Sequence, residues 1–222
     1  EGAVEDNNER EMLDVAGQLY TGRKEDLFVR FVAFVRQRRI CARDSGRQIV
    51  SSQAEAKRAA TRRHLHTMLS ECWDALDGLG RLVSICLSSR FPEAGLPAPD
   101  RMTHQCTFYT VRRDLHRDPQ ARQHPLVELL WKETRESPSE AYQRLSFLYN
   151  ISRFLPVPLT AGRELPGWED LPAWVRDQIR QQDVQRKPLR EGVDEILGWQ
   201  KDFVQACYGR ITAELNRQST TV

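Results

Sequence analysis

The sequence lacks a long apolar run, since no stretch approaches the roughly 20 apolar residues that a membrane-spanning helix needs. A transmembrane protein is therefore not expected. The composition, 40% hydrophobic and 29% charged residues, is typical of an ordinary soluble globular protein. The chain also begins without a methionine, a basic start or an apolar signal-peptide core, which indicates a segment of a longer polypeptide or a processed product.

The cysteines lack the number and spacing of a disulfide framework. The cysteines are odd in number, scattered along the chain and mostly set on apolar helical faces. This pattern predicts reduced and buried thiols, and hence an intracellular protein that is either cytoplasmic or nuclear. The five are Cys41, Cys72, Cys86, Cys106 and Cys207.

Motifs of known chemistry are also missing. The sequence has no HExxH, no phosphate-binding P-loop, no nucleophile elbow and no paired-carboxylate motif, so we predict that the protein is not an enzyme. The residues most suggestive of zinc are His104 and Cys106, followed by His116 and His124. Because only one pair among them is close in sequence, we predict no metal site, and nothing in the sequence implies a cofactor.

Helical periodicity is what the sequence does contain. Apolar residues recur every three or four positions over two long stretches, 48–90 and 188–217, and no polar–apolar alternation bounded by hairpin turns appears. The sequence therefore predicts an all-α fold, a compact bundle of about six to eight helices in which these two form the scaffold. We expect a single domain over 1–222.

Breaks in the periodicity indicate where the helices are connected. The proline-rich stretch 91–103 is expected to be an ordered connection or a hinge, because its prolines interrupt a helix. Residues 1–8 and 218–222 are expected to be disordered ends.

The most unusual stretch reads "FVRFVAFVRQRR" and covers 28–39. On a helical wheel its phenylalanines and valines fill an arc of about 220°, wider than the ~100° stripe of an ordinary surface helix. We therefore expect a core helix that is packed on more than one side and ends near Gln37. Arg38 and Arg39 follow directly, so the apolar face becomes cationic within one turn.

Three interpretations of these arginines stay open. In the first they extend into solvent or pair with acidic residues such as those near the N-terminus. In the second they line a groove that receives an acidic partner, either a protein helix or phosphate. In the third the stretch is a membrane-surface helix, which the preceding Glu25 and Asp26 disfavour.

These features predict a binding function. We expect a non-enzymatic intracellular module for protein–protein interaction or scaffolding, which could be a regulatory domain. It would bind a protein partner in a helical groove lined by apolar and arginine side chains. Two tryptophans in the turn "LPGWEDLPAW" are predicted to contact the partner as aromatic anchors. The sequence is also compatible with a homo-oligomer. The predicted partner-binding residues are Phe34, Val35, Arg36, Arg38, Arg39, Trp168 and Trp174.

The alternative is a helical domain that binds nucleic acid. Between Arg30 and Arg63 the chain carries ten Arg or Lys residues against two acidic ones, and arginine suits phosphate contacts. A nucleic-acid-binding domain would show these arginines on one exposed stripe, whereas an interaction module would show apolar surface beside them. A helical enzyme, the third option, would show a deep pocket holding histidine or carboxylates with perturbed pKa values. The predicted nucleic-acid contacts are Arg43, Arg47, Lys57, Arg58, Arg62 and Arg63.

Overall fold

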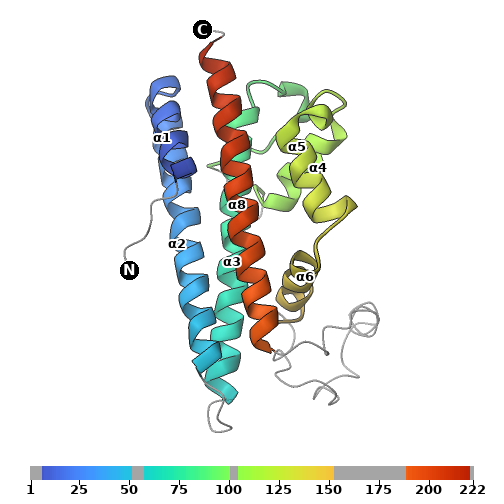
Figure 1. The fold of residues 1–222 in the computed structure, drawn as a ribbon. Helices are drawn as coiled ribbons and strands as arrows, with labels where there is room; N and C mark the ends of the chain where they lie inside the picture. Colours follow the sequence, from blue (N-terminus) through green and yellow to red (C-terminus); the bar gives the residue numbers. More distant parts are fainter. Residues whose placement is uncertain (1–6, 52–57, 101–104, 153–188, 221–222) are drawn as a thin grey trace. The chain divides into compact units, whose positions relative to one another are not determined.

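The computed structural model describes residues 7–51, 58–100, 105–152 and 189–220 (Figure 1). Within these ranges the chain forms α-helices and contains no strand, which confirms the predicted all-α fold. Short 3-10 or π segments lie at Pro92–Ala94, Ala121–Gln123 and Lys132–Glu136. The seven described α-helices are α1 (Asn7–Leu19), α2 (Arg23–Ser51), α3 (Arg58–Leu87), α4 (Phe108–Arg117), α5 (Pro125–Trp131), α6 (Glu140–Ser152) and α8 (Leu189–Ser219).

The chain divides into two compact units, each assembled from separate pieces of the sequence. The first unit takes residues 1–38, 74–138 and 201–222, and the second takes 39–73 and 139–200. Helices α2, α3 and α8 each contribute residues to both units. The expectation of one domain over the whole chain stays a prediction.

Helix α2 is longer than predicted, because it continues to Ser51 instead of ending near Gln37. Its second half buries Ala42, Gly46 and Ile49 at helical spacing. Alanine and glycine contribute little to the hydrophobic periodicity of a sequence. The helical pattern is therefore weak here, although the buried face of the helix continues.

The two predicted scaffold helices are present with changed bounds. The stretch 48–90 is divided, since residues 48–51 belong to α2 and α3 is described from Arg58 to Leu87. The prediction of 188–217 is confirmed by α8, which covers Leu189–Ser219.

The end of α3 is the centre of the first unit. Every residue from 78 to 87 is buried, so this part of the helix is covered on all sides. Its two polar side chains bond to the proline-rich stretch: the Ser84 hydroxyl donates to the carbonyl of Pro97 at 2.9 Å, and an Arg81 Nη1–H donates to that of Pro99 at 2.6 Å. The described part of that stretch is thus tied to α3.

Helix α4 begins against this central helix. The Thr107 side chain caps it in a reciprocal pair with Thr110, and the backbone N–H of Phe108 donates to Asp77 of α3 at 2.9 Å. Gly80 makes the approach close, since a Cβ there would lie 2.7 Å from the Phe108 Cα. Burial raises the pKa of Asp77 to about 6. Helix α5 packs beside α4 (Figure 1).

Aromatic pairs hold the second unit together. Trp73 of α3 stacks on Tyr149 of α6 with ring centroids 4.7 Å apart, and Tyr142 of α6 lies 5.2 Å from Trp199 of α8. Between α8 and α3, the Gln200 amide donates to the backbone carbonyl of Cys72 at 2.9 Å. These contacts join α3, α6 and α8 within this unit, which also contains the second half of α2.

Candidate functional site

A buried carboxylate organises one end of the first unit. The side chain of Glu214, in α8, is fully buried and accepts two hydrogen bonds from Arg90 Nη1 at 2.5 and 2.7 Å. It also accepts one from His124 Nε2 at 2.9 Å and one from Gln218 Nε2 at 3.2 Å. Burial alone would raise the pKa of Glu214, but these donors outweigh it and lower that pKa. Glu214 is therefore a fixed anion with its oxygens occupied.

His124 supports this carboxylate as a neutral donor. It precedes α5, and its Nδ1 accepts the backbone N–H of Leu126 at 3.2 Å, so the ring proton lies on Nε2 and points to Glu214. Burial lowers the pKa of His124, which keeps the ring neutral at pH 7. Both ring nitrogens are thus engaged, and the histidine has no free position for chemistry.

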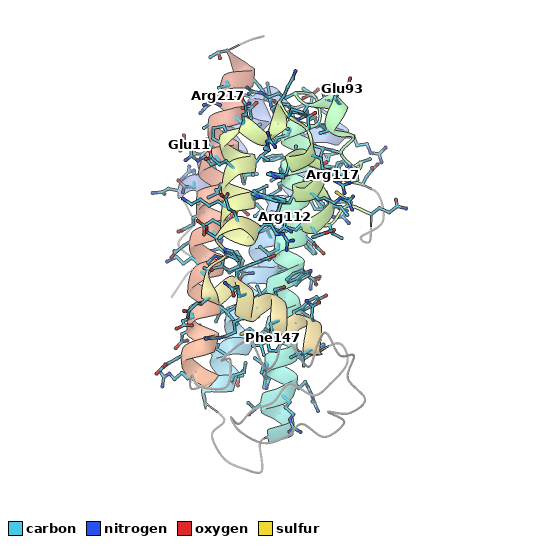
Figure 2. All side chains as sticks on the ribbon, turned by 90° about the vertical axis from the view of Figure 1, so that its right-hand side faces the viewer. Glu11, Glu93, Arg112, Arg117, Phe147 and Arg217 are labelled. Carbon is cyan, nitrogen blue, oxygen red and sulfur yellow. The ribbon has the colours of Figure 1, made fainter. Side chains whose placement is uncertain are left out.

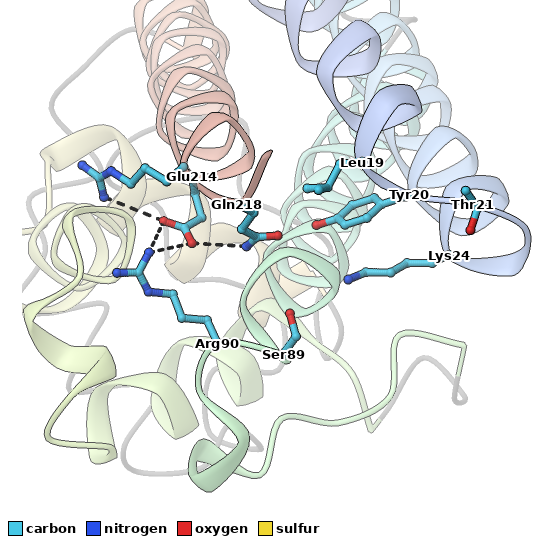
Figure 3. A pocket seen from close by; sticks show the side chains of 9 residues that line it. Leu19, Tyr20, Thr21, Lys24, Ser89, Arg90, Glu214 and Gln218 are labelled. Carbon is cyan, nitrogen blue, oxygen red and sulfur yellow. Dashed lines mark hydrogen bonds and ion pairs between the residues drawn. The ribbon is translucent and has the colours of Figure 1, made fainter. Parts of the chain in front are cut away.

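A pocket of about 700 Å³ opens beside this network, still within the first unit (Figure 3). It lies where α1 ends and α2 begins, next to the turn after α3 and the last turns of α8, from which Arg217 projects (Figure 2). Three of its lining side chains are cationic and one is a carboxylate, an excess of two positive charges. The lining residues are Leu19, Tyr20, Thr21, Lys24, Ser89, Arg90, Glu214, Arg217 and Gln218.

Tyr20 brings an unsatisfied donor into this pocket. Its side chain is 4% exposed, and its hydroxyl has no hydrogen-bond partner among the described residues. The Cys86 thiol lies near this hydroxyl, but sulfur is a weak acceptor and the contact falls outside hydrogen-bond geometry. Burial raises the pKa of Tyr20, so the hydroxyl keeps its proton.

Lys24 adds a second donor without an acceptor. Its Nζ lies 4.0 Å from the centroid of the Tyr20 ring, a cation–π contact, and within the described ranges it has no acidic partner. Burial lowers the pKa of Lys24, because the ammonium has lost part of its hydration without gaining a counter-charge. Figure 3 shows Tyr20, Lys24 and Ser89 pointing into the same space.

The predicted partner-binding residues of α2 are mostly engaged within the first unit. Val35 is fully buried and Phe34 is half-buried. Arg36 pairs with Glu9 at 3.2 Å, and Arg38 lies over the Phe34 ring at 4.7 Å. Arg38 also pairs with Asp74 at 3.8 Å. These contacts agree with the first interpretation of the arginines, in which they pair with acidic residues, including one near the N-terminus.

The remaining predicted residues belong to the second unit or lie outside the described ranges. Arg39 is half-buried, while Arg43 and Arg47 are exposed and both pair with Asp44. Arg62 and Arg63 are exposed on α3. Trp168, Trp174 and Lys57, together with the side chain of Arg58, lie outside the described residues.

Sequence reasoning missed the pocket. Tyr20, Lys24, Ser89 and Arg90 come from two distant segments, and none of them stands out from its neighbours. Glu214 did carry a signal, because it lies on the apolar face of the 188–217 ladder, where a carboxylate is unexpected. A carboxylate at such a position predicts buried cationic or hydrogen-bonding partners.

Neither a metal-binding cluster nor a membrane-spanning helix occurs among the described residues. These residues hold no group of three or more His, Cys, Asp or Glu side chains placed to bind a metal ion, and His104 lies outside them. Across the same ranges, no helix is both long and apolar enough to cross a bilayer.

Comparisons of this chain with protein-family models, with curated proteins and with solved structures found no match.

Proposed function

We propose that the protein is a non-enzymatic protein-interaction module, and that the pocket beside Glu214 receives an acidic group carried by a protein partner. The observation that supports this proposal is the pair of donors formed by Tyr20 and Lys24. A buried hydroxyl without an acceptor costs about 1–3 kcal/mol, and a partly buried ammonium without a counter-charge adds to that cost. An acidic group in the pocket would supply both the acceptor and the charge.

The state of the reactive groups favours binding over catalysis. Glu214 has its oxygens occupied, and His124 has both nitrogens engaged. The five cysteines are free thiols, and burial raises the pKa of Cys86 to about 12 and that of Cys106 to about 11. Such thiols carry little of the nucleophilic thiolate at neutral pH. The perturbed pKa values of Glu214, His124 and these cysteines therefore belong to groups that hold the structure in place.

A group presented by another protein fits the position of the pocket. Thr21, Ser89 and Arg217 are exposed at its border, while Tyr20 lies deeper. A side chain that projects from a partner can reach this depth while the partner's backbone stays outside. The excess positive charge would also attract an acidic partner and speed its association.

The proposal is tested by titrating the labelled protein with short blocked peptides, acidic and neutral, and following its amide signals by NMR. We expect the acidic peptides to shift the signals of residues 20–24 and 89–90, and Lys24→Gln to remove these shifts. Lys201→Gln, which removes an exposed lysine of α8 in the same unit, is the matched control and should bind as the wild type does. Equal effects of acidic and neutral peptides, or of the two variants, would contradict the proposal.

Nucleic-acid binding is the second candidate, and the exposure of four arginines favours it. Arg43, Arg47, Arg62 and Arg63 are exposed in the second unit, and Asp44 is the acid paired with the first two. The test is binding to a labelled duplex and to single-stranded RNA at two salt concentrations, with all four arginines changed to alanine. Salt-sensitive binding that this variant loses supports the candidate. The charge-matched control replaces four exposed arginines elsewhere, Arg10, Arg122, Arg135 and Arg210.

A further inference from the structure

The acidic group can be specified further, and this step rests on the function proposed above. We infer that the pocket binds a phosphate monoester, of the kind that a phosphoserine or phosphothreonine side chain carries, and that Tyr20, Lys24 and Ser89 donate hydrogen bonds to it.

The charge of the pocket favours a dianion. Lys24, Arg90 and Arg217 line the pocket together with one carboxylate, Glu214, so its lining carries two more positive than negative charges. A phosphate monoester carries a charge of about −1.5 to −2 at pH 7, which matches this excess. A carboxylate carries one negative charge and would balance only half of this excess.

The arrangement of the donors favours a tetrahedral group. The Tyr20 hydroxyl and the Lys24 ammonium enter from the end of α1 and the start of α2, and Ser89 enters from the turn after α3 (Figure 3). The hydroxyls of Ser89 and Thr21 make no hydrogen bond within the described residues, so they too can donate. Three phosphate oxygens that point in different directions use donors on opposite walls, whereas a planar carboxylate offers two oxygens in one plane.

Glu214 acts here as a positioning residue for Arg90. Two hydrogen bonds at 2.5 and 2.7 Å hold the Arg90 guanidinium at the wall of the pocket, and His124 and Gln218 fix the carboxylate from other sides. The Glu214 side chain is fully buried, so its charge is balanced by Arg90 and not by solvent. The cationic wall is thus in place before a ligand arrives.

The Tyr20 hydroxyl provides a test in which stability and binding change in opposite directions. Tyr20→Phe removes a buried donor that has no partner, so the melting temperature of the unliganded protein should rise by about 2–4 °C. The same change removes a hydrogen bond to a charged ligand, so affinity for a phosphoserine peptide should fall about tenfold or more. Tyr109→Phe alters a tyrosine that is 55% exposed and lies outside the pocket, and it should change neither quantity.

The experiment measures calorimetric affinities of the whole chain for three blocked peptides that differ at one position, phosphoserine, glutamate or serine, and for inorganic phosphate. We expect the phosphoserine peptide to bind at least about tenfold more tightly than the glutamate peptide and than inorganic phosphate. Equal binding of the glutamate peptide would overturn the phosphate inference and leave the acidic-partner proposal intact, whereas no binding of any acidic peptide would overturn both.

Two further outcomes are decisive. Inorganic phosphate that binds as tightly as the phosphopeptide would overturn the assignment to a protein side chain. A lower melting temperature for Tyr20→Phe would show that the hydroxyl is satisfied inside the protein, and would overturn its role as a ligand donor.

Discussion

Gly80 sets how closely α4 approaches α3, and replacing it with alanine tests the packing of the first unit. An added Cβ would lie 2.7 Å from the Phe108 Cα and 3.0 Å from its backbone N. Both are backbone atoms, so no side-chain rotation relieves the overlap and the start of α4 must move. That movement would also strain the 2.9 Å hydrogen bond from the Phe108 N–H to Asp77.

The opposing contributions can be estimated. Alanine in a helix is favoured over glycine by about 1 kcal/mol. Overpacking costs typically 1–3 kcal/mol, and a weakened hydrogen bond adds about 0.5–1.5 kcal/mol. We therefore expect Gly80→Ala to lower the free energy of unfolding by about 1–3 kcal/mol.

Gly209→Ala is the matched control, because it makes the same substitution within α8 at an exposed position where an added Cβ meets nothing within 4 Å. It should raise the free energy of unfolding by about 0.5–1 kcal/mol. Urea denaturation followed by circular dichroism measures both variants. If Gly80→Ala is as stable as Gly209→Ala, the close approach of α4 to α3 is not as described.

Three other predictions concern the buried polar groups. Burial raises the pKa of Asp77 from 3.8 to about 6, so the cost of its charge to the folded state grows as the pH rises between these two values and is complete above them. Asp77→Asn should therefore be more stable than the wild type at pH 8 by about 1–3 kcal/mol, with a smaller gap at pH 4 in the same urea assay. Glu214→Gln leaves Arg90 without its counter-charge and should lower the free energy of unfolding, measured by thermal unfolding, by about 2–3 kcal/mol. The control Glu11→Gln, at an exposed position, should lower it by less than about 0.5 kcal/mol. Similar losses in the two variants would contradict the role of the buried carboxylate. With a thiol reagent under native conditions, Cys41 should react first, since the other four cysteines are buried, and rapid reaction of all five thiols would refute that burial.

The helices were largely predictable, and the exceptions have a physical cause. The 188–217 ladder repeats large apolar residues at three and four positions, and α8 follows it closely. Helix α2 was cut short in prediction because Ala42 and Gly46 continue its buried face with almost no side chain. Hydrophobic periodicity is recognised from large apolar side chains, so a buried helix face made of small residues is not predicted by it.

The candidate site was less predictable, because it depends on contacts between distant segments. Arg90 and Glu214 are 124 residues apart. The Tyr20 hydroxyl is notable only because it has no hydrogen-bond partner among the described residues of the fold. Conversely, Arg36 looked available in sequence and is paired with Glu9 in the fold. Composition indicates which charges are present, whereas tertiary contacts decide which of them stay free.

The discontinuous make-up of the two units has a consequence for biosynthesis. Residues 189–200 of α8 belong to the second unit and residues 201–219 to the first, so neither unit is complete until this helix has been made. Up to that point in translation, the end of α3, which is covered on all sides in the finished fold, has part of its apolar surface exposed. A ribosome adds about 5–20 residues per second, so the nascent chain waits for seconds with this surface uncovered, and uncovered apolar surface makes a folding intermediate prone to aggregation.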